Sequence, residues 1–319
     1  MPGKRYLKFF NWPGSKVRVL PWLLPKFEIA DRGLYVEPFL GSGNVWLNVP
    51  EKFSQYILND KVPYVIRFFK AMADVSCRVA LLEQLERLRA TYPVKPSPKL
   101  KQKIVNHAEL TPDEVEQRNT LKQSYYNLRD KWNGHRRENL NNAANLTWSN
   151  AAFAYLCGAC INNLVRFGSN GNFNQGWGQR ELDLNSFGLV ADRVAHRNNR
   201  TWFHTHDFNS LLSNISVRGL LSRSVVYLDP PYGTRSEARV NGLYGLENSW
   251  TAENDQAVMA WCLAIHKADG LFVLSNLMEN PGVARLIQEF NVQVVPIKYK
   301  ASVGRHEVRE QTEVIISNF

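Results

Sequence analysis

The stretch LYVEPFLGSGNVWLNVPEKFSQYILND, residues 34–60, decides the fold. It begins with a short apolar run and passes through the turn Gly41-Ser42-Gly43. It continues with residues that can start a helix at 44–49 and ends with a second apolar run at 56–58. A strand, a glycine turn, a helix and a second strand in this order open a parallel, doubly wound sheet. The sequence therefore predicts an α/β fold.

The pattern of such a sheet returns only in the last third of the chain. Apolar runs typical of strands occur at 224–228, 271–274, 292–297 and 314–316. The intervening part is mainly helical in its periodicity, and we expect loops in it at 92–103, 140–148 and 167–178. We therefore expect one α/β domain built from residues 1–72 and 201–319, interrupted by a mainly helical insertion at 73–200.

Composition narrows the class of protein. The chain has 319 residues, of which 44% are hydrophobic and 21% charged, which is typical of a folded domain. It has neither a signal peptide nor an apolar run of roughly 18 residues, so a cytoplasmic location is expected. The net charge of +10 favours a polyanionic partner but does not by itself prove one.

The four cysteines are too few for a disulfide framework in a chain of this length. Cys157 and Cys160 form a CxxC motif, to which His204 and His206 would be the candidate additional ligands of a metal. The motif lies in a small apolar stretch that resembles a buried helix. We therefore expect buried thiols and no metal.

The strongest chemical signal is Asp229-Pro230-Pro231-Tyr232, directly after the apolar run 224–228. Two prolines fix the backbone and remove two N–H donors. The Asp229 carboxylate and the Pro230 carbonyl can then each accept one N–H of an exocyclic amine and orient its lone pair toward an electrophile. Tyr232 offers a face on which a base can stack. The alternative is a turn at the end of a strand with a capping aspartate.

The glycine turn is weaker evidence on its own. The dinucleotide fingerprint G-x-G-x-x-G is incomplete because Trp46 occupies its third glycine position. A bulky residue there argues against a bound pyrophosphate and favours a cofactor without phosphates. Asp60 follows about twenty residues later, where an acid can hold ribose hydroxyls. It can equally cap the helix that begins near Pro63.

Together these motifs resemble the Dam-type, or D12 class, DNA adenine methylases of the α group, over most of the chain. The resemblance implies methyl transfer from S-adenosyl-L-methionine to N6 of adenine, with Asp229–Tyr232 as the catalytic motif. The segment FNWPGSK, residues 10–16, resembles the family's first motif, from which Pro13 and Ser15 depart. The resemblance assigns cofactor contacts to Trp12, Lys16, Glu37, Phe39, Gly41, Gly43, Asp60, Asp207, Phe208 and Asp229.

The resemblance also implies that the insertion recognises the target in double-stranded DNA. We expect the protein to be a monomer or a weak dimer. Arg166, Asn170 and Asn174 lie in a stretch that is similar to the family's recognition motif, with irregular spacing. An adenine in a duplex must leave the stack to reach Asp229. We expect Arg235 and Arg239, in the segment 233–250, to contact DNA from a loop that closes over the flipped base. An ordinary surface loop is the alternative.

Three other functions remain open at this point. The substrate can be adenine in RNA or a protein amide, although protein-glutamine methylases usually carry Asn where Asp229 stands. The chain can be a DNA-binding protein that does not catalyse. A nicotinamide-dependent oxidoreductase is disfavoured by Trp46 and by the lack of an acid suited to hydride chemistry.

Overall fold

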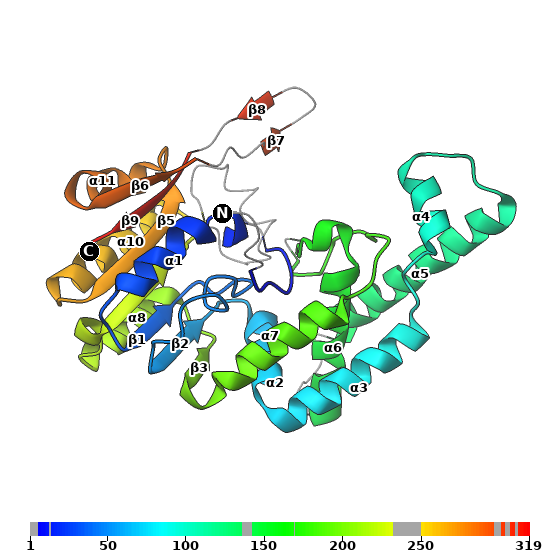
Figure 1. Cartoon of the computed structure of the whole chain (residues 1–319), viewed down its shortest axis with the longest axis horizontal. Coiled ribbons are helices and arrows are strands. Elements are labelled where there is room, and N and C mark those ends of the chain that lie inside the picture. Colours follow the sequence, from blue (N-terminus) through cyan, green and yellow to red (C-terminus); the bar gives the residue numbers. More distant parts are fainter. Residues whose placement is uncertain are drawn as a thin grey trace. The chain divides into compact units, whose positions relative to one another are not determined.

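The chain folds into two compact units, each built from segments that lie far apart in the sequence (Figure 1). The first unit comprises Met1–Tyr6, Gly14–Ile66 and Asn199–Phe319, and the second comprises Leu7–Pro13 and Arg67–Asn198. The computed structural model describes residues 6–12, 14–135, 142–168, 170–231, 250–296, 301–303, 307–309 and 312–319.

The first unit is organised around a seven-stranded sheet whose spatial order is β3-β2-β1-β4-β5-β9-β6. The five strands from β3 to β5 in this order are parallel, and β9 is antiparallel to both of its neighbours. This confirms a mostly parallel, doubly wound α/β fold. The strands are β1 (Leu34–Glu37), β2 (Gln55–Asn59), β3 (Thr201–His204), β4 (Ser224–Leu228), β5 (Leu271–Leu277), β6 (Asn291–Val295) and β9 (Glu313–Ser317). A separate hairpin pairs β7 (Ala301–Val303) with β8 (Glu307–Arg309).

The central strands are buried along their whole length and largely apolar because both faces of the sheet are covered. Every residue of β1, β4 and β9 is buried. Parallel strands that are covered on both faces read as continuous apolar runs, which is the pattern in the sequence. The helical elements of this unit are η1 (Lys16–Arg18), α1 (Leu20–Ile29), α8 (Phe208–Val217), η4 (Leu221–Arg223), α10 (Ala252–Lys267), η5 (Pro281–Val283) and α11 (Ala284–Glu289). Buried residues of α8 and α10 pack with those of β1, β4 and β5 in one apolar cluster.

The strand order places a topological switch point between β1 and β4. The chain proceeds from β1 to β2 and β3 on one side, and β4 and β5 lie on the other side. Connections that diverge from neighbouring strands leave a crevice at their carboxyl ends, where ligands bind in sheets of this type. Glu37 ends β1 and Asp229 follows β4, so both lie at this edge.

The helix expected at 44–49 is wrong, because the chain forms consecutive turns there. Gly41 and Gly43 have φ angles of 50° and 66°, a region in which side chains other than glycine are strained. The Leu47 N–H donates to the Gly43 carbonyl over 2.9 Å, which is a helical hydrogen bond within a single turn. The segment that follows β1 therefore forms a series of tight turns and not the start of a regular helix.

The second unit is mainly helical. Helix α2 (Pro63–Ala73) begins in the first unit and continues into the second, η3 (Asn198–Arg200) lies at their other boundary, and α6 contacts both α3 and α5. The residues from Ser149 to Ala159 of α6 are all buried, as expected for the central helix of a bundle. Its elements are α3 (Val75–Thr91), α4 (Pro98–Val105), α5 (Pro112–His135), α6 (Ala143–Ala159), η2 (Ile161–Asn163) and α7 (Leu184–His196). No helix among the described residues combines the length and apolar character that a membrane span requires.

Two loops expected in this unit are helical in part. Helix α4 begins inside 92–103, where the Ser97 side chain accepts from the Leu100 N–H and Pro98 occupies the first turn. Helix α6 begins inside 140–148, where the side chain of Asn142 accepts from Ala144 and Asn145. The prolines and lysines of 92–103 and the asparagines of 140–148 predict loops, but proline and asparagine are also favoured at the start of a helix.

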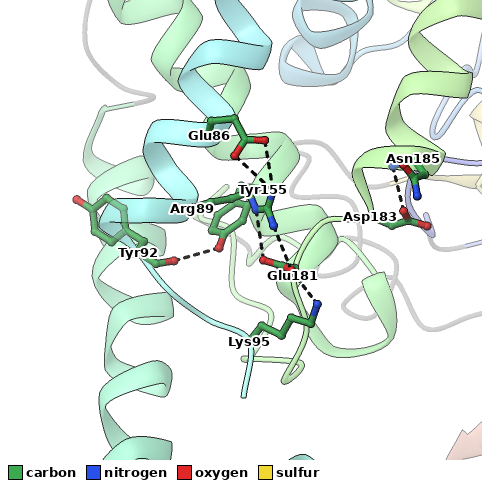
Figure 2. Close-up of polar contacts among 8 residues, drawn as sticks. All are labelled: Glu86, Arg89, Tyr92, Lys95, Tyr155, Glu181, Asp183 and Asn185. Carbon is green, nitrogen blue, oxygen red and sulfur yellow. Dashed lines mark hydrogen bonds and ion pairs between the residues drawn. The ribbon is translucent and has the colours of Figure 1, made fainter. Parts of the chain in front are cut away.

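A charge cluster joins the segment that follows α6 to α3 (Figure 2). The Glu181 carboxylate lies 3.3 Å from Arg89 Nη2 and 2.9 Å from Lys95 Nζ. Beside it, the Tyr155 hydroxyl donates to the Tyr92 carbonyl over 3.1 Å. Burial by itself would raise the pKa of Glu181, but Lys95 and Arg89 lower it below its ordinary value. These contacts connect α3, α6 and the loop before α7 within the second unit.

Candidate functional site

The carboxylate of Asp229 follows the fully buried strand β4 and remains 20% exposed. The next residue, Pro230, is buried. Lys16, in η1, places its Nζ atom 2.7 Å from Asp229 Oδ1. Two residues that the sequence assigned to the same site, more than 200 positions apart, are therefore in direct contact.

Lys16 also contacts a residue that sequence reasoning missed. Its Nζ atom lies 3.6 Å from Glu313 Oε1, at the start of β9, and donates to the Gly14 carbonyl over 2.8 Å. Burial by itself would lower the pKa of Lys16, but Asp229 and then Glu313 outweigh burial and raise the pKa well above its usual range. A carboxylate at the start of an otherwise apolar strand was the signal in the sequence.

Glu37, the last residue of β1, lies beneath the glycine turn and is almost completely buried. The Tyr35 hydroxyl donates to Glu37 Oε2 over 2.7 Å, and the Trp46 backbone N–H also donates to this carboxylate. Burial raises the pKa of Glu37 well above its usual range. Glu37 thus links β1 to Trp46, which follows the glycine turn.

The Asp60 carboxylate accepts hydrogen bonds from two backbone N–H groups, one in the glycine turn and one just before α2. Its Oδ2 atom accepts from the Gly41 N–H over 2.7 Å, and its Oδ1 atom accepts from the Val62 N–H over 2.8 Å, just before α2. The contact with Val62 is a turn just before α2 and not the helix cap that was the alternative for this residue, because α2 begins only at Pro63. Burial raises the pKa of Asp60 to about 6. Contact with ribose hydroxyls remains a prediction.

Asn59 is a second residue that sequence reasoning missed. Its side-chain amide donates to the carbonyls of Pro38 and His206, both over 3.0 Å, and its Oδ1 atom accepts from the His206 N–H over 2.9 Å. The side chain therefore ties the end of β1 to the turn that follows β3. An amide makes such a bidentate backbone contact, whereas an apolar side chain does not.

Three aromatic rings, those of Phe39, Phe208 and Trp250, contact one another in the first unit. The ring centroids of Phe39 and Phe208 are 5.1 Å apart, and Trp250 lies 5.7 Å from Phe39 and 5.6 Å from Phe208. Asp207 is exposed, and its side chain caps α8 by accepting from the Asn209 N–H over 3.0 Å. The sequence placed Trp250 at the end of a DNA-contacting segment, whereas the structure packs it against two residues expected to bind the cofactor.

Four of the remaining site residues lie in the second unit. Trp12 is buried there, and its ring contacts those of Phe10 and Phe167. A short hairpin carries the others: Phe167 and Phe173 form an antiparallel bridge, and the Asn174 N–H donates to the Arg166 carbonyl over 3.0 Å.

The hairpin has two distinct faces. Phe167 and Phe173 are buried against the ring of Trp132, with centroids 6.3 Å and 6.2 Å from it. Arg166, Asn170 and Asn174 are exposed. Because side chains alternate between the faces of an extended chain, burial of the two phenylalanines directs Arg166 and Asn174 toward solvent.

Three predicted site residues, Tyr232, Arg235 and Arg239, lie outside the residues that the structure describes. Cys157 and Cys160 are buried, and burial raises the pKa of both thiols. Across the described part of the chain, no three His, Cys, Asp or Glu side chains gather in a way that would hold a metal ion.

Comparison with known proteins agrees with this geometry. A model of the D12 class N6 adenine-specific DNA methyltransferases matches residues 12–300. The chain is 23% identical over 306 residues to the type II methyltransferase M.MjaIII of Methanocaldococcus jannaschii, an alignment that covers 91% of each chain. It is 23% identical to a DNA adenine methylase of Vibrio cholerae over 96% of this chain and 95% of the relative. It is 27% identical to the DNA adenine methylase of Escherichia coli K12 over 78% of this chain and 73% of the relative.

Proposed function

The chain belongs to the D12 class N6 adenine-specific DNA methyltransferases, and from that premise we propose that it uses S-adenosyl-L-methionine to methylate an adenine that is flipped out of duplex DNA. The single observation that supports this best is the contact between Lys16 and Asp229 at the carboxyl end of β4. It brings a residue of the N-terminal motif and a residue of the motif after β4 together at the switch point of the sheet.

The residues at the end of β1 suit this cofactor. A half-buried Phe39 beside Phe208 offers aromatic surface for an adenine ring, and Asp60 offers carboxylate oxygens for ribose hydroxyls. The glycine turn leads into further turns and not into a helix whose N-terminus would favour a pyrophosphate. When bound, S-adenosyl-L-methionine supplies an electrophilic methyl group. Glu37 and Asn59 shape this site through their hydrogen bonds. Glu37 holds the segment after the glycine turn, and Asn59 holds the residues that follow β1 and β3.

Asp229 and Pro230 act on the target amine. The Asp229 carboxylate accepts one N–H of the N6 amine and the Pro230 carbonyl accepts the other, which directs the nitrogen lone pair toward the methyl group. Positive charge develops on N6 during attack, and the carboxylate stabilises it. Lys16 fixes the orientation of Asp229 through the 2.7 Å contact. Tyr232 is proposed to stack on the flipped base.

The second unit includes most of the insertion that we expected at 73–200, together with Leu7–Pro13, and is proposed to recognise the DNA. Arg166, Asn170 and Asn174 project from the hairpin whose apolar face is anchored on Trp132. Exposed arginine and asparagine side chains on a rigid support suit phosphate and base-edge contacts. We also propose contacts by Arg235 and Arg239, in keeping with the net charge of +10.

The decisive experiment incubates the protein with duplex DNA and S-adenosyl-L-methionine, digests the DNA and measures N6-methyladenine. We expect methylation by the wild type and at least a hundredfold loss in Asp229→Asn, because one preorganised acceptor supplies about that factor. Asp269→Asn is the matched control, since Asp269 is 92% exposed and its φ of 59° suits asparagine. Matched RNA of the same sequence is the second substrate. Methylation of RNA alone would replace DNA as the substrate, and no product with either would refute the proposal.

A further inference from the structure

Two carboxylates approach one ammonium group at the active edge of the sheet. Lys16 Nζ lies 2.7 Å from Asp229 Oδ1 and 3.6 Å from Glu313 Oε1. The side chains of Lys16 and Glu313 are 3% and 1% exposed, so bulk water screens them little, whereas Asp229 is 20% exposed. Within the described residues, the positive and the two negative groups of this cluster give it a formal charge of −1.

Glu313 reaches this edge because β9 runs against the other strands. It is the first residue of β9 and pairs with Leu277, the last residue of β5, in the antiparallel register. The start of an antiparallel strand lies at the same edge as the ends of its parallel neighbours. The topology thus places Glu313 at the same edge of the sheet as the end of β4, with β5 between the two strands, although Glu313 is 84 positions from Asp229 in the sequence.

We propose that Glu313 is a positioning residue that shares the Lys16 ammonium with Asp229. The ammonium then neutralises Asp229 only in part, and the three groups together present a net negative charge to the target amine. This inference rests on the proposed function of Asp229. An aspartate paired one-to-one with a lysine forms a neutral pair and stabilises the charge that develops on N6 only weakly. A second carboxylate on the same lysine restores the negative potential at the position of the amine.

The burial of Lys16 and Glu313 supports the ion pair on which this role depends. The more distant carboxylate, Glu313, is the more deeply buried one, and ionised groups are seldom buried without a compensating charge. The raised pKa of Lys16 keeps its ammonium protonated beside both carboxylates. Glu313 touches neither substrate nor cofactor in this scheme, and it acts through Lys16.

The first test compares Glu313→Gln with Glu313→Asp under single-turnover conditions at saturating S-adenosyl-L-methionine and duplex DNA. The glutamine keeps the size of the side chain and removes its charge. We expect methyl transfer to slow about tenfold in Glu313→Gln. The dissociation constants for S-adenosylhomocysteine and DNA are expected to stay within about twofold of wild type. Glu313→Asp, which keeps the charge, is expected to recover most of the rate.

Glu279→Gln is the matched control. Its side chain is exposed, and it accepts from the Thr312 N–H, at the residue just before Glu313, without contacting Lys16 in the described structure. We expect wild-type rates from this variant. A wild-type rate in Glu313→Gln would overturn the proposal. Equal losses in rate, ligand binding and melting temperature would also overturn it, because they would indicate a structural role only.

The second test does not depend on activity. It measures urea unfolding of the wild type, Asp229→Asn, Glu313→Gln and the double variant. If both carboxylates share Lys16, Glu313→Gln destabilises more in the Asp229→Asn background, where the buried ammonium has lost its other carboxylate. Additive effects would overturn the sharing of Lys16 whatever the activity. A wild type that makes no N6-methyladenine would instead refute the proposed function.

Discussion

Asp60 Oδ2 accepts a hydrogen bond from the Gly41 N–H over 2.7 Å, so the carboxylate after β2 holds the glycine turn after β1. The same carboxylate accepts from Val62 on the other side. A residue expected to bind a cofactor is thus also part of the framework that shapes the loop. Changes at Asp60 are therefore expected to affect the stability of the protein, whatever their effect on the proposed ligand binding.

The stability of the protein is expected to depend on pH through Asp60. Burial raises the pKa of this group from 3.8 to about 6. The stability it contributes is therefore complete below about pH 4 and is lost as the pH rises through about 6, by at most about 3 kcal/mol. Urea unfolding from about pH 4 to 7 should show the wild type losing stability relative to Asp60→Asn. A difference between the two proteins that does not change with pH would contradict this prediction.

The aromatic cluster is expected to bind the adenine ring of the cofactor. Phe39→Ala should weaken the binding of S-adenosylhomocysteine, measured by calorimetry, by about tenfold or more, because a stacked base contributes about 1–3 kcal/mol. Phe290→Ala serves as the control, since Phe290 is also partly buried and packs on Phe272, with 5.0 Å between ring centroids. If both variants bind the ligand equally well, Phe39 has only a packing role.

The hairpin of the second unit is expected to contact DNA phosphates through Arg166. Arg166→Ala should weaken duplex binding and reduce the slope of log affinity against log salt concentration by about 1. Arg87→Ala tests the effect of removing any exposed arginine from this unit, since Arg87 is 71% exposed and pairs with Glu83 on α3. An unchanged salt slope in Arg166→Ala would remove this residue from the interface.

The Glu181 cluster is expected to stabilise the second unit above acidic pH. Because the pKa of Glu181 in the folded protein is lower than its ordinary value of 4.5, its contribution is present above that value. It is lost as the pH falls through the folded pKa. Glu181→Gln should cost about 1 kcal/mol at neutral pH and less under acid conditions. Thermal unfolding at both pH values checks this, and an equal loss at both would show that the charge is not responsible.

Much of the site could be predicted because its residues follow strand ends. Glu37 and Asp229 come directly after apolar runs that form β1 and β4. The carboxyl ends of parallel strands meet at one edge, so a local pattern suffices to group such residues. The turn after β1 was harder to predict, since helical hydrogen bonds and turns compete over a few residues there.

The sequence by itself determined the doubly wound sheet, the glycine turn and the place of Asp229 at a strand end, because each depends on local periodicity and on backbone limits set by glycine and proline. Only the tertiary structure decided that Glu313 joins Lys16 and that Trp250 packs on Phe39. Both contacts join segments that are more than 200 residues apart. Their geometry depends on where β9 enters the sheet and how α10 packs against it, and long-range burial and strand register fix both.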